Sequence, residues 1–404
     1  MHGGFRGASV RPGHPDFLDL PWSDPFDQWP ELTPRVEDLP RGESRNPVVF
    51  VAYEGRPYAL KALEPGRAEL EYAALRAMEA KKLPVVSAVG HLARTVDGRD
   101  ESVLITRFLD HSMPYRALFT ERGLGRYREH LLDALAGLLV QLHVAGVFWG
   151  DCSLSNTLFL RDAGTLNAYL VDAETSSVDE SVSDQRRKTE LELMEENVAG
   201  ALFDLIAQGS LPSDFSVAAT VWSIRERYEA LWTEIQREEV LLRGDHFAIE
   251  ERIRRLNALG FSVGEIELEE AGHGVRLRAI VTDRTFHRDL LHSLTGLVVQ
   301  ERQAQLMVNE IRQIRASLST AQNRSMSLSA AAYHWSERVF APSVLRIRAC
   351  VHVDEVDDAE RYCQLLEHKW YLSEKARRDV GLEVALDDYL RTLGSADAAT
   401  TSAG

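Results

Sequence analysis

The sequence predicts an α+β fold of two lobes, followed by a mainly helical C-terminal domain with a small β-hairpin. Three observations lead to this prediction. Strand-like patterns dominate residues 48–109, helical patterns begin near residue 126, and two short apolar segments follow residue 156. Strands followed by helices is the order expected when a sheet packs with a helical lobe in one α+β domain.

Composition narrows the classes of protein that the chain can represent. Its 404 residues suffice for two or three domains, and 45% hydrophobic with 27% charged residues is typical of a globular protein. No apolar run approaches the roughly 18 residues that cross a bilayer, and the first six residues lack the apolar core of a signal peptide. We therefore expect a cytoplasmic protein without a transmembrane segment.

The charge and the cysteines of the chain argue against nucleic-acid binding and against disulfide or zinc sites. The formal net charge of −16 disfavours general binding to nucleic acid. The three cysteines include no Cys-x-x-Cys pair, so neither a disulfide framework nor a structural zinc site is expected.

Changes in composition and periodicity predict the domain boundaries. Within the C-terminal half, helices are expected at 217–242 and 247–259, and a hairpin from 266–268 with 275–281. The expected parts are an irregular arm at 1–34, the two-lobed domain at 35–210, a helical domain with the hairpin at 211–317, a flexible linker at 318–330, a helical segment at 331–393, and a disordered tail at 394–404.

The first lobe is expected to be two hairpins with a helix between them. Glu54-Gly55-Arg56 and Asp97-Gly98 are turn sequences that separate strand-like segments. The expected strands are 48–53, 58–63, 85–92 and 102–109, and the expected helix is 67–81.

Lys61 lies on the second of these strands, in Tyr58-Ala59-Leu60-Lys61, where an ammonium group can reach the phosphates of a nucleotide. Glu71, ten residues later on the helix, can pair with it. Glu69 is a competitor for this role, and a solvated helix face is the ordinary alternative for either glutamate. We favour Glu71 because it lies beside an apolar stripe of Tyr72, Leu75 and Met78.

The strongest motif follows the helix at 126–145. Leu142-His143 and Gly146 end that helix, Gly150-Asp151 comes next, and Asn156 stands five residues later before a strand-like segment. This spacing is typical of the catalytic loop of small-molecule and atypical kinases, with the Asp at an acceptor hydroxyl and the Asn amide at a metal.

A second carboxylate follows the next apolar strand. Asp172 comes directly after Ala168-Tyr169-Leu170-Val171, sixteen residues beyond Asn156. Carboxylate oxygens at this place suit a hard cation such as Mg²⁺. Glu174 is a possible second metal contact, and Asp-Ala-Glu replaces the Asp-Phe-Gly of most kinases.

The order of these residues along the chain predicts a protein-kinase-like fold that uses ATP and Mg²⁺. That order is lysine, glutamate, aspartate, asparagine and a second aspartate. The sequence departs from the pattern twice. Trp149 stands where kinases usually carry His, and it can narrow the acceptor site. No Gly-x-Gly-x-x-Gly precedes the lysine strand. The segment at that position has other groups that can bind phosphate through backbone N–H groups and guanidinium groups. These residues are Arg41, Gly42, Ser44 and Arg45. The alternative is that the segment is an ordinary loop.

The chain resembles a bacterial kinase-like family of unknown function, which has a lipopolysaccharide-kinase-like (Kdo/WaaP-type) front half and a conserved, uncharacterised C-terminal domain. The resemblance rests on the segments 39–45, 104–107, 114–119, 148–159, 254–261 and 366–375. It implies that Trp149 is a family trait. It does not supply a substrate, because an acceptor taken from the family name would rest on fold alone.

These observations leave three functions open. The first is Mg-ATP-dependent phosphoryl transfer to an alcohol group on a small molecule, a sugar or a protein. The second is an ATP-binding pseudokinase that acts as a scaffold, with a protein partner on its C-terminal domain. The third is nucleotidyl transfer to protein. Residue types favour activity, because Lys61, Asp151, Asn156 and Asp172 all keep the groups that ATP chemistry requires.

Overall fold

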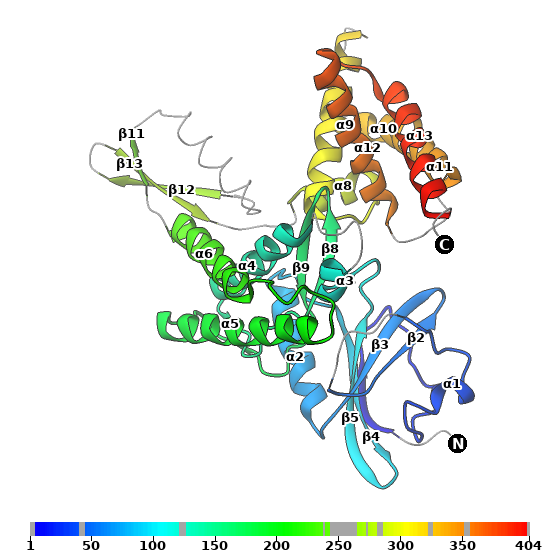
Figure 1. Cartoon of the computed structure of the whole chain (residues 1–404), viewed down its shortest axis with the longest axis vertical. Coiled ribbons are helices and arrows are strands. Elements are labelled where there is room, and N and C mark those ends of the chain that lie inside the picture. The colour runs from blue at the N-terminus through cyan, green and yellow to red at the C-terminus, as the bar shows by residue number, and fades with distance from the viewer. Residues whose placement is uncertain are drawn as a thin grey trace. The chain divides into compact units, whose positions relative to one another are not determined.

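The chain folds as two compact units in the computed structural model (Figure 1). The N-terminal unit comprises Met1–Leu160 and Asn167–Arg237, and the C-terminal unit comprises Arg161–Leu166 and Glu238–Gly404. The structure describes residues 5–39, 45–120, 127–236, 239–242, 265–271, 274–280, 286–321, 326–350 and 356–401.

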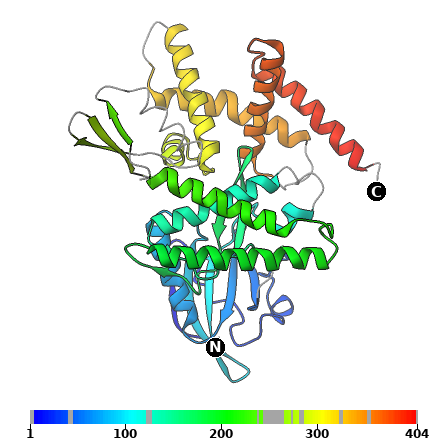
Figure 2. The same ribbon diagram turned by 60° about the vertical axis from the view of Figure 1, so that its left-hand side comes forward.

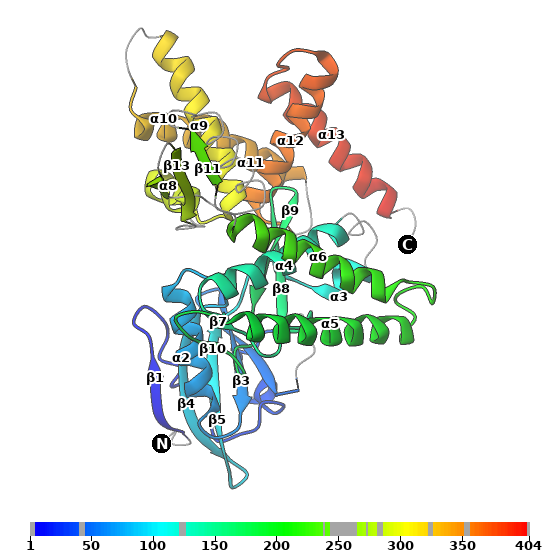
Figure 3. The same cartoon turned by 90° about the vertical axis from the view of Figure 1, so that its left-hand side faces the viewer.

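The first lobe of the N-terminal unit is a five-stranded antiparallel sheet in the order β1-β4-β5-β3-β2, with one helix packed against β4 and β5 (Figure 3). Its hairpins turn at Glu54-Gly55 and Asp97-Gly98, where both residues of each pair have positive φ, as two-residue hairpins require. The elements are β1 (Phe5–Val10), α1 (Trp29–Leu32), β2 (Val48–Tyr53), β3 (Arg56–Leu63), α2 (Arg67–Ala80), β4 (Ala88–Val96) and β5 (Arg99–Arg107).

Residues 1–34 are more regular than the sequence predicts. β1 pairs with the edge of β4, and Pro30 sits in the first turn of the short helix α1. The sequence pattern indicates neither element. β1 forms because it pairs with another strand, not because its own residues alternate, and α1 is a single turn, too short to show a helical period. Trp22 and Trp29 pack with alternate residues of β2 and β3 in one buried cluster. That cluster includes Tyr58, Leu60 and Ala62, so the arm covers the face of β3 opposite Lys61.

The second lobe is mainly helical. α4 is buried along most of its length, and α5 and α6 lie side by side in Figures 1 and 2. The elements are β6 (Met113–Pro114), α3 (Tyr115–Thr120), α4 (Arg128–Val144), β7 (Val147–Phe148), β8 (Thr157–Asp162), β9 (Thr165–Leu170), β10 (Ser177–Val178), α5 (Asp184–Ala207) and α6 (Val217–Gln236).

The boundary between the units differs from the one expected at residue 210. α6 belongs to the N-terminal unit, where its Tyr228 hydroxyl lies 2.8 Å from His143 Nδ1 on α4. The helix expected at 217–242 ends at Gln236, and β11 (Glu239–Leu242) follows it. Helical periodicity alone does not reveal which neighbour a helix packs against, so the sequence does not show that α6 packs on α4.

The C-terminal unit is mainly helical with a small sheet, as predicted. The expected hairpin is formed by β12 (Glu265–Ala271) and β13 (Gly274–Ile280), and β11 adds a third strand beside β13. The remaining elements are α8 (Phe286–Thr295), α9 (Glu301–Ala321), α10 (Leu328–Trp335), a π-helical turn at Ser336–Phe340, α11 (Ala341–Cys350), α12 (Asp358–Ala376) and α13 (Leu382–Thr401).

Three predicted segments of this half differ from the structure or lie outside the described residues. The helix expected at 247–259 lies outside the described residues. The linker expected at 318–330 is narrower, since α9 runs to Ala321 and α10 begins at Leu328. The tail expected to be disordered from 394 is helical to Thr401, because α13 continues through its alanines. None of the described helices is long and apolar enough to cross a membrane.

Candidate active site

β3 and α2 bring together the first pair of expected residues. Lys61 Nζ lies 3.1 Å from Glu71 Oε2, and the Glu71 side chain is fully buried. Glu69, the competitor, is exposed. The apolar stripe decides between them, because Leu75 and Met78 turn the face of α2 that carries Glu71 toward the sheet.

Asp172 completes an ion-paired triad on the lysine. It follows β9, and its Oδ2 lies 2.7 Å from Lys61 Nζ. The backbone N–H of Ala173 donates to Glu71 Oε1 at 3.1 Å, and that of Glu174 donates to Asp172 Oδ1 at 3.1 Å. Glu71 therefore fixes both the lysine and the segment that carries Asp172.

Burial and charge act on this triad in opposite directions. Burial lowers the pKa of Lys61, but the carboxylates of Glu71 and Asp172 outweigh it and raise the pKa overall. Burial raises the pKa of Glu71, the Lys61 ammonium lowers it, and the Asp172 charge raises it, with a net rise. The lysine therefore stays charged, as contact with phosphate requires.

The catalytic loop is held in a compact turn before β8. Asn156 Nδ2 donates to Asp151 Oδ2 at 3.0 Å, and the Asn156 carbonyl accepts from Val171 N–H at 3.1 Å. The second bond joins the start of β8 to the end of β9, so Asn156 lies beside the residue that precedes Asp172. The Asn156 side-chain oxygen remains for a metal, since its nitrogen is used as a donor.

Asn197 on α5 contacts the same aspartate, a contact that no sequence motif indicates. Its Nδ2 donates to Asp151 Oδ1 at 3.1 Å and to the Cys152 carbonyl at 3.1 Å. Each oxygen of Asp151 thus accepts from a side-chain amide. No motif places an asparagine on a helix 46 residues after the loop, so this contact needed the fold.

The buried Glu190 on α5 also holds the catalytic loop in place. Its Oε1 accepts from the Gly150 N–H at 2.6 Å, and its Oε2 lies 2.7 Å from His143 Nε2. The side chains of both Glu190 and His143 are fully buried. Gly150 has φ +83°, and a Cβ there would lie 2.8 Å from the Thr175 carbonyl. Only glycine fits this position without moving the loop.

Trp149 has a different place from the one suggested by the sequence. It is fully buried, and its indole Nε1 donates to the Asp172 carbonyl at 2.9 Å. Its own carbonyl accepts from Thr175 Oγ1 at 2.9 Å. Trp149 therefore braces the segment around Asp172 and does not narrow an acceptor site.

Of the remaining expected residues, Arg45 is exposed in a bend, and Arg41, Gly42 and Ser44 lie outside the described residues. Glu174 Oε1 lies 4.0 Å from Arg67 Nε. Where the structure describes side chains, no three His, Cys, Asp or Glu residues form a metal cage by themselves. Asp172 and the Asn156 oxygen are hard oxygen donors that fit Mg²⁺ when substrate phosphates supply further ligands.

Together, a strand lysine, a helix glutamate, a loop aspartate with its asparagine, and a second aspartate after a strand define a protein-kinase-like domain. Residues 56–209 match the family model "Lipopolysaccharide kinase (Kdo/WaaP) family", and residues 230–393 match "Domain of unknown function (DUF4032)". The resemblance expected from the sequence is thus confirmed for both halves.

Among solved structures, the chain is similar to "WaaP in complex with acyl carrier protein", at 17% sequence identity and a TM-score of 0.38. The similarity covers 63% of this chain and 99% of that one. No curated protein sequence matches the chain significantly.

Proposed function

We propose that the N-terminal unit is a phosphotransferase that uses Mg-ATP and transfers the γ-phosphoryl group to an alcohol. The observation that carries the proposal is the triad in which Lys61 lies between Glu71 and Asp172. In the catalytic loop, each carboxylate oxygen of Asp151 accepts a hydrogen bond from a side-chain amide. A scaffold that only bound a partner would not need either arrangement.

Each residue then has a role that its position supports. The Lys61 ammonium contacts phosphate oxygens, and Glu71 keeps it pointed there. Asp151 orients the acceptor hydroxyl and receives its proton as the new O–P bond forms and ADP leaves. Mg²⁺, held by Asp172 and the Asn156 oxygen, would neutralise charge on the phosphates. Asn197 and Glu190 are positioning residues, because they touch the loop and not the reacting atoms.

The acceptor is proposed only as a class. Phosphoryl transfer to a hydroxyl follows from the aspartate in the loop, and the family name adds a sugar of a lipid as one candidate acceptor. A small molecule, a sugar and a protein hydroxyl all remain within the proposal. A protein partner for the C-terminal unit also stays a prediction.

The test compares Asp151→Asn with wild type, using ATP labelled in either the γ- or the α-phosphate. Water serves as the first acceptor, so phosphate release can be followed before the natural acceptor is known. We expect Asp151→Asn to lower turnover by about 10²–10⁴ while Mg-ATP still binds. Asp133→Asn, an exposed residue that pairs with Arg227, is the matched control and should keep full activity.

The label distinguishes the alternatives. Transfer of the γ-phosphate supports the kinase, whereas incorporation of the α-phosphate would show nucleotidyl transfer and refute it. Binding of Mg-ATP without turnover on water or on any hydroxyl acceptor would favour a scaffold.

A further inference from the structure

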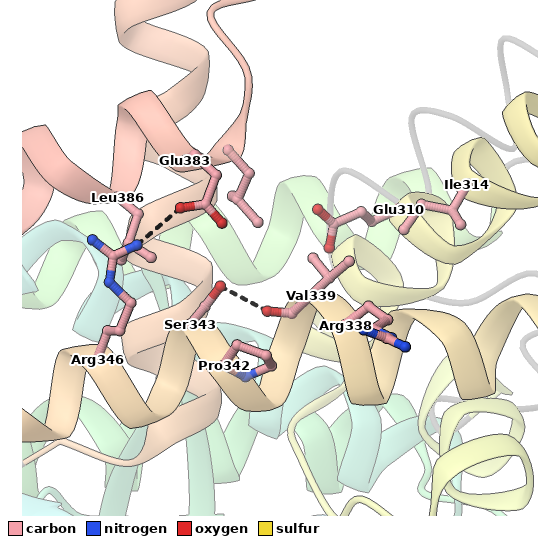
Figure 4. A pocket seen from close by; sticks show the side chains of 10 residues that line it. Glu310, Ile314, Arg338, Val339, Pro342, Ser343, Arg346, Glu383 and Leu386 are labelled. Atoms are coloured by element: carbon pink, nitrogen blue, oxygen red, sulfur yellow. Dashed lines mark hydrogen bonds and ion pairs between the residues drawn. The ribbon is translucent and has the colours of Figure 1, made fainter.

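The C-terminal unit contains a cavity of about 280 Å³ between α9, the π-helical turn, α11 and α13 (Figure 4). Its lining combines a partly buried acid, an apolar wall and a charged rim. None of these residues belongs to the site in the N-terminal unit.

Glu310 is this acid, and its side chain is partly buried. Its Oε2 accepts two hydrogen bonds, from Trp335 Nε1 at 2.6 Å and from the Tyr362 hydroxyl at 2.5 Å. Both donors are neutral, and no described Lys, Arg or His forms an ion pair with this carboxylate. Burial raises the pKa of Glu310, and the two hydrogen bonds and the charge of Lys369, which is not in direct contact, only partly offset this. A largely covered carboxylate with no cation in direct contact gains when one is supplied.

The wall of the cavity includes an irregular turn of helix. Residues Ser336–Phe340 form a π-helical turn between α10 and α11, in which the Ala341 N–H donates to the Ser336 carbonyl. Pro342 has no N–H for the Arg338 carbonyl, which explains why the α-helical pattern is interrupted here. Such π turns within helices occur frequently at functional sites.

The rest of the lining is apolar, uncharged, ion-paired or exposed to water. Ile314, Val339 and Leu386 contribute the apolar wall, and Val339 lies between Glu310 and Ser343 in Figure 4. On the rim, Arg346 lies 2.9 Å from Glu383 and 2.5 Å from Asp387. Arg338 is exposed, so water solvates its charge. The charge of a ligand inside is therefore set by Glu310.

We propose that this cavity binds a small organic amine, with its ammonium group on the Glu310 carboxylate and its aliphatic body against Val339, Ile314 and Leu386. An amine both pairs this charge and replaces water along the apolar wall. The cavity is slightly smaller than the roughly 300–1,000 Å³ of common ligand pockets, so the ligand is a small metabolite. This inference does not depend on the kinase proposal, because the two sites share no residue.

The test uses n-pentylamine with two matched probes, 1-pentanol and pentanoate, on the full chain. Binding is followed by ligand-observed NMR at about 10 mM, enough to occupy a site with a millimolar Kd. We expect saturable binding of pentylamine only. Equal binding of pentanol would reveal an apolar cavity without charge recognition, and no binding of pentylamine would remove the proposal.

Two variants locate the binding. Glu310→Gln keeps the shape of the side chain and should weaken pentylamine binding by about 10- to 100-fold. Because Glu310→Gln can also disturb Trp335 and Tyr362, Val339→Phe serves as the second variant: it fills the cavity and leaves Glu310 in place. Glu374→Gln, at an exposed position of α12 outside the cavity lining, is the control and should bind normally. Unchanged binding in Val339→Phe, with its fold intact by circular dichroism, would contradict the assignment.

Discussion

Buried carboxylates serve different purposes in the two units. In the N-terminal unit, Glu71 and Glu190 each hold a backbone N–H of a loop that also carries a reactive group. In the C-terminal unit, Asp162 accepts from two N–H groups at the start of α9, and Glu360 accepts from the Ala163 N–H. The first pair of carboxylates positions the residues of the candidate active site. The second pair satisfies backbone N–H groups at the ends of a helix and a strand.

The difference explains why only one unit could be interpreted from its sequence. Phosphoryl transfer imposes an order and a spacing on its residues, so their functional groups stand out. A carboxylate that satisfies a helix end has no fixed spacing to its partner, and its role becomes visible only after folding.

The largest expected effect tests the glycine of the catalytic loop. Gly150→Ala places a Cβ 2.8 Å from the Thr175 carbonyl at a positive φ, so the loop must move. A displacement near 1 Å can lower turnover by about 100-fold. Steady-state ATP turnover is the measurement.

Gly381→Ala in the C-terminal unit is its matched control. That glycine also has positive φ, at +79°, but a Cβ there meets nothing within 4 Å. It should cost about 1–2 kcal/mol of stability through backbone strain and leave turnover intact. Equal losses of turnover in both variants would mean that Gly150→Ala acts through backbone strain alone and not through displacement of the catalytic loop.

The next effect concerns the positioning asparagine. Asn197→Ala removes one of the two amides that hold Asp151, and we expect turnover to fall by about 10-fold with an unchanged KM for ATP. Asn309→Ala, an exposed asparagine on α9, is the control in the other unit. A rise in KM without a fall in kcat would show that Asn197 supports nucleotide binding instead.

A smaller effect is expected in the C-terminal unit. Asp162→Ala leaves the N–H groups of Arg302 and Gln303 without their carboxylate, which should cost about 1–3 kcal/mol of that unit's stability. Asp358→Ala removes a partly exposed ion pair with Arg348 and should change stability by less than about 1 kcal/mol. Chemical denaturation measures both. Similar losses would refute the structural role of Asp162.

The smallest effect is a change in pH dependence. Lys61 needs the ionised form of Glu71, and burial raises the pKa of this acid above the ordinary value of about 4.3. Activity should therefore fall, as pH is lowered, at a higher pH than an ordinary glutamate would give. In Glu71→Gln this acidic decline should be absent from the kcat profile. A decline that persists in Glu71→Gln belongs to another group.

Much of the site was predictable, and the reasons for the misses are physical. Lys61, Glu71 and Asp172 meet as their spacing predicts. The role of Asn197 was not predicted because contact between α5 and the catalytic loop depends on tertiary packing. Trp149 was misjudged because a sequence does not show that an aromatic ring faces the core. The pairing of β1 and the packing of α6 were not predictable, because both depend on which neighbour the element contacts after folding.

We propose that the N-terminal unit binds ATP through Mg²⁺ at Asp172. Thermal unfolding with millimolar ATP, with and without Mg²⁺, tests it most directly in wild type and Asp172→Asn. A ligand present at about 100 times its Kd stabilises the folded state by about 2.7 kcal/mol, so the wild-type Tm should rise with Mg-ATP. The rise should need Mg²⁺ and vanish in Asp172→Asn. A wild type that shows no rise, or an equal rise in the variant, would contradict the claim.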